Sequence, residues 1–406
     1  MPTASKLLEK SMTAGVGANV FVPYFSDGAL KALSFCNLKD ATETNLVFIA
    51  DFTNKDIKQL TATQPYSDWL GSTVKPWKVI ETKNEIIIYC LGVRANYLVI
   101  LKVVFNKSDE TATISEYKSY NFTWLDYVQE LRAGIVIGDT AFLGELDVGT
   151  LHVVDLISGT CVNVDLSANL SYMPKPSWKV VNVILDSTCR QIMFMGENVN
   201  NAPFYAFDMN RLSVVSTLVS TGGGSSRALI GGLAVFEDKR IIPLSSGGVN
   251  NSDNDMVFYD EHLNNLGTFD LAQIIDYPEV TYGFNLIAKL TDGRYFGIGS
   301  FHKNVADRND EFCRFAWVIL GSNFAYDNHG VILETALGEW SLQGVNLSRE
   351  HGNQTLLPIV DLNNYKAYIW LVKQDTAGNI THYLYEVDFS DLSIDEVNPI
   401  AYLVYL

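Results

Sequence analysis

The stretch Val153-Val154-Asp155-Leu156-Ile157-Ser158-Gly159-Thr160 has a pattern that recurs along this chain. It is an apolar strand that ends in Asp, followed by a short turn and a second strand from Cys161. Similar segments recur elsewhere in the chain. The residue that ends the first strand of each segment, here called the anchor, is Asp51, Asn106, Asp208, Asp260 or Asp388. The anchors at 51, 106, 155, 208 and 260 lie 55, 49, 53 and 52 residues apart. Such a period is typical of repeat architectures, in which each unit packs on its neighbours.

The segments between the anchors have the pattern of short strands separated by turn residues. The strands are apolar on both faces, as in 85–90 and 368–372, which is expected of a sheet that lies between two other sheets. Thr291-Asp292-Gly293-Arg294 contains the Asp-Gly pair that a tight hairpin favours. The helices of a doubly wound α/β fold are missing. The sequence therefore predicts an all-β protein, a β-propeller of about seven four-stranded blades.

The pattern of strands and turns also predicts the bounds of the N-terminal arm, of the propeller domain and of its blades. A short helix is expected over residues 4–12, with Leu7, Leu8 and Met12 on one side, within an N-terminal helical arm at 1–17. A single β-propeller domain follows at 18–406. Its blades are expected at about 18–62, 75–118, 130–167, 177–220, 226–270, 281–338 and 352–398. We expect the closing strand, 399–406, to pair with the N-terminal blade and complete the ring.

Composition limits the classes of function. The 406 residues carry a net charge of −17, which argues against a surface that grips nucleic acid or an anionic membrane. Residues 1–21 lack the long apolar core of a signal peptide, and no apolar run reaches the ~18 residues of a membrane span. The five cysteines are scattered without a Cys-x-x-Cys pair, so we expect buried free thiols.

Carboxylates are the commonest candidate site residues. One acidic loop holds Asn250, Asn251, Asp253 and Asp255, and another holds Asp307, Asp310 and Glu311. Alternating Asp and Asn oxygens suit Ca²⁺, but the Gly and distal Glu of a calcium-binding loop are missing. We therefore predict no metal and no cofactor, and treat these loops as polar binding surface. The recurrent anchor acids are better explained as caps of the turns that follow them than as a ring of functional acids.

No catalytic arrangement is apparent, and we predict that the chain is not an enzyme. The six histidines are not at ligand spacing, and no Gly-x-Ser-x-Gly motif occurs. The glycine-rich stretch 222–226 lacks the Lys of a phosphate-binding loop. Most tryptophans, such as Trp317 and Trp370, lie within apolar strands and are expected in the core.

Residues 154–160 resemble the strand–turn–strand of pyrroloquinoline-quinone-type propeller repeats, without their closing Trp. The chain as a whole is similar to the propeller-containing nozzle and adaptor proteins of bacteriophage tails. That resemblance implies a structural subunit, made in the host cytoplasm and assembled with other protein subunits into a ring within the virion. The other origin for such a scaffold is an unrelated bacterial interaction propeller in the cytoplasm. An acidic wall would suit a DNA conduit, because it repels the passing polyanion. The alternative is a carbohydrate-binding or carbohydrate-active propeller that uses its loop face or central channel.

Overall fold

In a computed structural model of the chain, the residues described are 1–12, 20–35, 45–62, 75–94, 96–125, 134–145, 149–168, 174–176, 184–185, 191–197, 204–218, 229–230, 234–236, 240–245, 255–260, 262–275, 280–281, 284–303, 312–336, 341–343, 359–361, 363–374 and 379–399. Their strands form separate antiparallel sheets, numbered here I to VII in chain order. Each sheet is built around a four-stranded unit, and sheets IV to VII contain additional strands.

The first three sheets are simple meanders. Sheet I contains β2 (Val20–Ser26), β3 (Ala29–Phe35), β4 (Asn45–Asp51) and β5 (Asp56–Ala62). Sheet II contains β6 (Lys75–Glu81), β7 (Glu85–Arg94), β8 (Tyr97–Asn106) and β9 (Thr111–Asn121). Sheet III contains β10 (Ile135–Ile137), β11 (Thr140–Gly144), β12 (Thr150–Asp155) and β13 (Cys161–Asp165).

In each of the next two sheets, two short strands pair with the same longer strand. In sheet IV these are β14 (Pro174–Pro176) and β15 (Ile184–Leu185), followed by β16 (Gln191–Glu197), β17 (Phe204–Asp208) and β18 (Ser213–Leu218). In sheet V they are β19 (Leu229–Ile230) and β20 (Ala234–Val235), followed by β21 (Arg240–Ser245), β22 (Asp255–Tyr259) and β23 (Asn265–Asp270). One 3-10 turn, η1 (Leu271–Gln273), follows β23.

The last two sheets include strands from distant parts of the chain. Sheet VI contains β24 (Val280–Thr281), β25 (Phe284–Leu290), β26 (Tyr295–Lys303), β27 (Phe312–Leu320), β28 (Tyr326–Glu334) and β33 (Ile394–Pro399). Sheet VII contains β29 (Ser341–Gln343), β30 (Ile359–Asp361), β31 (Lys366–Gln374), β32 (Ile380–Asp388) and β1 (Thr3–Met12).

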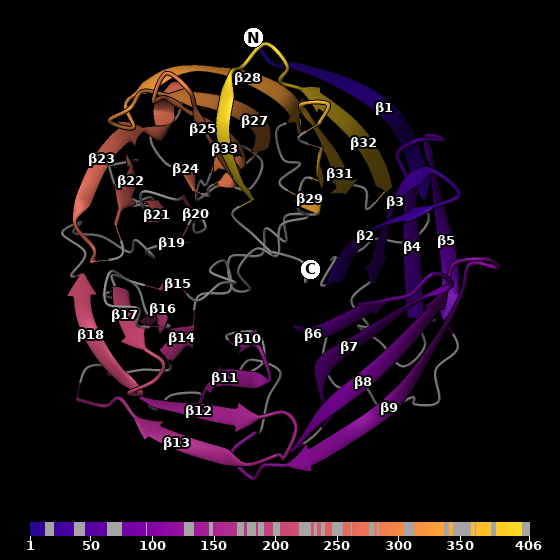
Figure 1. The fold of residues 1–406 in the computed structure, drawn as a ribbon, viewed down its shortest axis with the longest axis vertical. Coiled ribbons are helices and arrows are strands. Elements are labelled where there is room, and N and C mark those ends of the chain that lie inside the picture. Colours follow the sequence, from indigo (N-terminus) through magenta and orange to yellow (C-terminus); the bar gives the residue numbers. More distant parts are fainter. Residues whose placement is uncertain are drawn as a thin grey trace.

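Figure 1 shows these sheets arranged radially around a central axis, with one strand of each at the outer rim. This is β-propeller architecture, and it confirms the predicted all-β propeller built on four-stranded units. The rim strands are β1, β5, β9, β13, β18, β23 and β28 (Figure 1). None of the described helices is long and apolar enough to cross a membrane.

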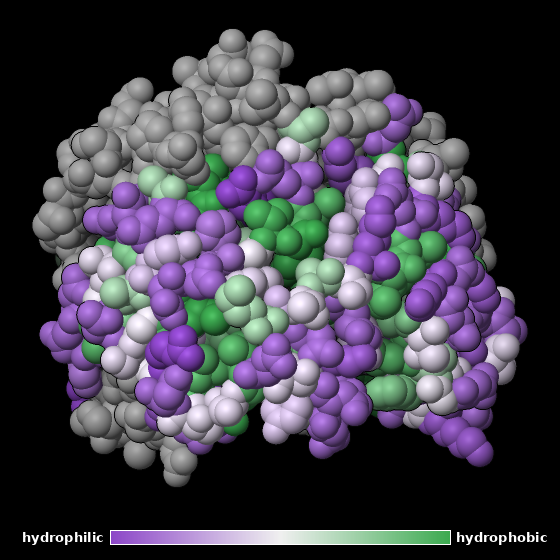
Figure 2. Space-filling view, turned by 90° about the horizontal axis from the view of Figure 1, so that it is seen from above, coloured by the Kyte–Doolittle hydropathy of each residue, from purple (hydrophilic) through white to green (hydrophobic). Residues whose placement is uncertain are grey.

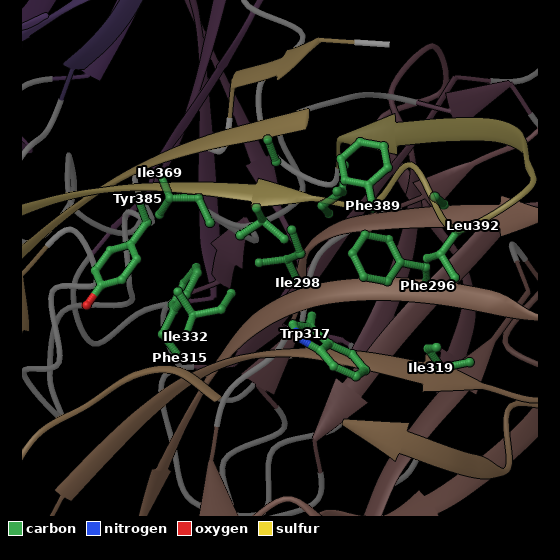
Figure 3. Packing of buried hydrophobic residues seen from close by; sticks show 14 of the residues in the cluster. Phe296, Ile298, Phe315, Trp317, Ile319, Ile332, Ile369, Tyr385, Phe389 and Leu392 are labelled. Atoms are coloured by element: carbon green, nitrogen blue, oxygen red, sulfur yellow. The ribbon is translucent and has the colours of Figure 1, made fainter. Parts of the chain in front are cut away.

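Burial of both sheet faces, seen in the described residues of sheets I, II, III, VI and VII, explains the continuous apolar strands. Val47 and Ile49 of β4 pack in a cluster with sheet II, whereas Phe48 and Ala50 pack in a cluster with sheet VII. Successive side chains of a strand point to opposite faces, so one strand supplies two cores. Figure 3 shows the cluster between sheets VI and VII, where Trp317 is 6% exposed. Trp370 is 1% exposed, so both tryptophans are in the core as predicted.

The predicted N-terminal helix was wrong, because residues 3–12 form strand β1. It pairs antiparallel with β32, from Thr3 opposite Asp388 to Met12 opposite Ile380. A register shift between Lys6 and Leu8 interrupts the alternation. Leu8 and Met12, four residues apart, share one strand face, and the register shift lets Leu7, adjacent to Leu8, pack on the same cluster between sheets I and VII. The apolar pattern fits a helix equally well, and the free edge of β32 determines the outcome.

The N-terminal strand completes the last sheet of the chain, which the sequence did not indicate. β1 is the outer strand of sheet VII and pairs with β32. After β32, strand β33 pairs with β25 of sheet VI, from Leu290 opposite Ile394 to Leu286 opposite Pro399. Residues 400–406 of the predicted closing strand lie outside the described residues, so the pairing of that strand with the N-terminal blade stays a prediction.

The side of the ring that Figure 2 presents carries hydrophobic surface in several separate areas, with hydrophilic residues between them. Ten large hydrophobic residues are exposed in the described part of the chain. Four of these lie on rim strands, namely Tyr117, Val162, Val215 and Val331. The rim therefore combines strand edges with exposed apolar side chains.

Deleting residues 1–12 is expected to destabilise the protein strongly. The deletion exposes the edge of β32 and removes three half-buried apolar side chains, each contributing about 1 kcal/mol. We expect the free energy of unfolding in urea to fall by about 3 kcal/mol or more. Exchanging the exposed neighbours, Ala4→Ser with Ser5→Ala, should have no effect. Equal stability of the deletion variant and the full chain would contradict closure by β1.

Candidate functional site

The predicted acidic-loop site is represented by one residue in the described structure. Asp255 begins β22, where it lies opposite Asp270 of β23 and is partly exposed. Asn250, Asn251, Asp253, Asp307, Asp310 and Glu311 lie outside the described residues. Within those residues, no three or more His, Cys, Asp or Glu side chains group as metal ligands. Binding at the acidic loops stays a prediction.

The recurrent anchor acids cap turns, as predicted. Asp155 Oδ1 accepts the backbone N–H groups of Ile157 (2.9 Å) and Ser158 (2.7 Å). These hydrogen bonds and that of the Ser158 hydroxyl hold the pKa of Asp155 below its usual value. The same role is played by Asp51, Asp208, Asp260 and Asp388, and by Asn106. The acids therefore satisfy backbone donors, and they are distributed around the ring.

The capped turns also join neighbouring sheets, which the sequence did not indicate. The turn after Asp155 packs on β9 of the preceding sheet. The Tyr120 hydroxyl donates to the carbonyl oxygens of Leu156 (2.8 Å) and Ile157 (3.1 Å). Gly159, at φ +77°, lies against the same ring: a Cβ there would be 2.3 Å from Tyr120. Glycine is thus required at position 159 for two reasons: its φ is positive, and the Tyr120 ring leaves no space for a Cβ.

Other turns make equivalent contacts with the preceding sheet. Glu110, in the turn between β8 and β9, accepts from Lys31 Nζ (3.1 Å) and Lys58 Nζ (2.7 Å) of sheet I. Between sheets VII and I, Lys10 Nζ of β1 donates to Asp56 Oδ1 (2.8 Å) and to the Ile57 carbonyl (2.6 Å). The rim turn of one sheet and the preceding sheet therefore form a repeated joint.

A polar centre surrounds His152 on β12, between sheets II and III. His152 is 1% exposed. Its Nε2 lies 3.0 Å from Glu145 Oε2 and its Nδ1 lies 2.8 Å from Asn163 Oδ1. The Trp124 ring stacks on the imidazole, with centroids 3.6 Å apart and an interplanar angle of 0°. Both ring nitrogens are bonded and one ring face is covered, so the imidazole is held in one orientation.

Cys161 completes this His152 centre. Cys161 and Asn163 lie two residues apart on β13, on the face that His152 occupies on β12. Cys161 Sγ lies 3.9 Å from His152 Nδ1 and 3.4 Å from Asn163 Oδ1. The thiol is half-buried, and burial raises its pKa despite a hydrogen bond with Trp124. Cys161 is therefore a neutral thiol at pH 7, which is unsuited to act as an activated nucleophile.

This centre was not predicted from the sequence, because its members do not lie at regular ligand spacing. Glu145, His152, Cys161 and Asn163 are brought together only by the pairing of β12 with β13, where His152 lies opposite Asn163. A weak signal was present: His152 interrupts a buried strand, and a buried polar residue requires partners. The predicted buried thiols are found at Cys90 and Cys313, whereas Cys161 is only half-buried.

No protein-family model matches the chain, and no curated protein matches it. Solved structures match at the level of the fold. The Cps50 (Swd1) β-propeller domain of Myceliophteria thermophila is 8% identical with a TM-score of 0.39, covering 92% of this chain and 98% of that one. U3-55K is 8% identical with a TM-score of 0.43, over 92% and 98%. The dihydro-heme d1 dehydrogenase NirN, in complex with DHE, is 11% identical with a TM-score of 0.38, over 93% and 68%. These similarities concern the fold alone.

Gly159→Ala tests the joint between sheets II and III. The alanine would adopt an unfavourable φ, costing about 1 to 2 kcal/mol, and would clash with Tyr120, costing about 1 to 3 kcal/mol more. Gly28→Ala is a matched control, because Gly28 has the same φ of +77° with nothing within 4 Å of the added Cβ. Urea unfolding should show the larger loss for Gly159→Ala. Equal losses would mean that the turn does not pack tightly on Tyr120.

Glu110→Gln tests the joint between sheets I and II through its pH dependence. Burial disfavours ionised Glu110, but the hydrogen bonds from Lys58 and Lys31 outweigh it and lower the pKa from 4.5. The stabilisation is therefore present above pH 4.5 and is lost as pH falls through the lower folded-state pKa. The variant should be less stable than the natural protein at pH 7, and this difference should disappear in acid.

The matched control is Glu9→Gln, which removes the Lys6–Glu9 pair, whose side chains are 50% and 48% exposed. An exposed pair of this kind contributes little at any pH. Urea unfolding of both variants from neutral pH to about pH 3 makes the comparison. A Glu110→Gln difference that stays constant over this range would refute the role of the ionised carboxylate.

Proposed function

We propose that the sheets form one closed ring of seven blades that acts as a non-catalytic scaffold, contacting other protein subunits through its rim. The observation that carries this proposal is the position of exposed apolar residues on rim strands. Tyr117, on the eleven-residue β9, is 48% exposed, and Val162 on β13 is 54% exposed. Val331 on β28 is 46% exposed. Strand edges with apolar side chains favour association with another protein surface.

The repeated joints support a rigid presenting body rather than a mobile one. Each joint fixes a rim turn to the preceding sheet by hydrogen bonds or ion pairs, as at Tyr120 and Glu110. Surfaces on a rigid body lose little conformational entropy when a partner binds. A ring of such blades is therefore well suited to hold several subunits in fixed positions.

The finer proposal is a subunit of a phage tail nozzle or adaptor, assembled as a homo-oligomeric ring in the virion. It rests on the resemblance noted from the sequence and on the net charge of −17, which would repel DNA from the wall of a conduit. The carbohydrate-binding propeller is the competing function, and the same experiment separates the two.

Native mass spectrometry and negative-stain microscopy of the purified chain test the proposal. We expect a defined oligomer that dissociates when the rim carries Tyr117→Glu, Val162→Glu and Val331→Glu, since buried charges oppose association. Phe25→Glu is the control: Phe25 is 68% exposed but lies on β2, away from the rim, so the oligomer should persist. A monomer at all concentrations that binds ligands on a glycan array would overturn the scaffold proposal.

A further inference from the structure

We propose that Cys161, His152 and Asn163 form a binding site for a transition-metal ion of the Zn²⁺ class. The site is independent of the proposed scaffold function. It uses two ligands that such ions prefer, a cysteine sulfur and an imidazole nitrogen, with an amide oxygen as the third donor. It contains only two residues of the usual ligand types, consistent with the absence of larger His, Cys, Asp or Glu groups among the described residues.

The three donor atoms already converge. The separations are 3.9 Å from Sγ to Nδ1, 3.4 Å from Sγ to Asn163 Oδ1, and 2.8 Å from Nδ1 to Oδ1. In a tetrahedral site with metal–sulfur bonds of about 2.3 Å and metal–nitrogen bonds of about 2.0 Å, donors lie about 3.4 to 3.6 Å apart. An ion therefore requires the Asn163 amide to move away from the imidazole by about half an ångström. The sulfur needs only a smaller shift.

The surroundings supply the contacts that metal ligands usually have. Glu145 Oε2 lies 3.0 Å from Nε2 and can accept its N–H, so Nδ1 is the nitrogen that would bind an ion; the ion would replace the 2.8 Å contact between Nδ1 and Asn163 Oδ1. Trp124 covers the imidazole face and hydrogen-bonds to the sulfur. The carboxylate would thus orient the metal-bound histidine, and the indole donor would stabilise a coordinated thiolate.

The exposure of Cys161 and the types of donor limit which ions would bind. An ion binds cysteine as the thiolate, so it must displace the thiol proton. Cys161 is half-buried, so an ion bound there would be accessible to solvent. The sulfur and imidazole donors favour Zn²⁺, Co²⁺ or Cu²⁺ over Mg²⁺ and Ca²⁺, which prefer oxygen ligands.

Co²⁺ is the probe, titrated into the full chain and followed by absorbance. We expect a near-ultraviolet thiolate-to-Co²⁺ band that Zn²⁺ displaces and that Cys161→Ser abolishes. Circular dichroism would verify that Cys161→Ser folds, which is expected because residue 161 is half-buried at the start of a rim strand. A folded natural chain without the band at millimolar Co²⁺, or an unchanged band in Cys161→Ser, would overturn the proposal.

Two further variants test the assigned roles. Glu145→Gln should weaken Co²⁺ binding by about tenfold while keeping the band, because it removes only the partner of Nε2. Asn163→Asp should tighten binding, because it replaces an amide oxygen with a carboxylate. Weaker binding in Asn163→Asp would show that residue 163 is not a ligand. Peptide mapping after alkylation should also show Zn²⁺ protecting Cys161, and unprotected alkylation would count against the site.

Discussion

Burial of both sheet faces is the constraint on which the rest of this structure depends, and the described residues show it for sheets I, II, III, VI and VII. A sheet with Val47 and Ile49 on one face and Phe48 and Ala50 on the other is stable only between two neighbours. Each such sheet therefore needs a neighbour on both sides, and the last sheet of the chain packs on the first. β1 meets it there, since its side chains and those of β32 enter the cluster that contains Phe48. The chain terminus is therefore part of the core structure.

The capped turns solve a second problem, the angular position of each blade. Apolar packing between sheets is non-directional and would tolerate small rotations. The contacts of Tyr120 with the turn after Asp155, and of Lys58 with Glu110, are directional and lie near the rim. Each holds one sheet against the preceding one at the largest radius. The anchor Asp is required because its carboxylate fixes the turn that presents these groups.

The fold was predictable where local sequence and tertiary environment agree. The period of the anchors and the strands with two apolar faces indicate a propeller, and Asp capping follows from short-range chemistry. The error at β1 arose because Leu7, Leu8 and Met12 fit one helix face, whereas the bulge and the edge of β32 direct them to one side of a strand. The edge lies more than 360 residues away, and no local pattern carries that information. The His152 centre was missed for the same reason, since strand pairing assembles it.

The side chains proposed to bind a metal ion and the side chain proposed to contact a partner lie on opposite faces of β13. Cys161 and Asn163 point toward His152 and sheet II, whereas Val162 between them is exposed on the other face. A metal ion at Cys161 and Asn163 would cross-link β13 to His152 of β12 and so restrain the rim strand that carries Val162. Binding at the face toward sheet II would then stiffen the opposite face, which carries Val162, without contacting a partner there. Rim association and metal binding can therefore be coupled through one strand while depending on different side chains.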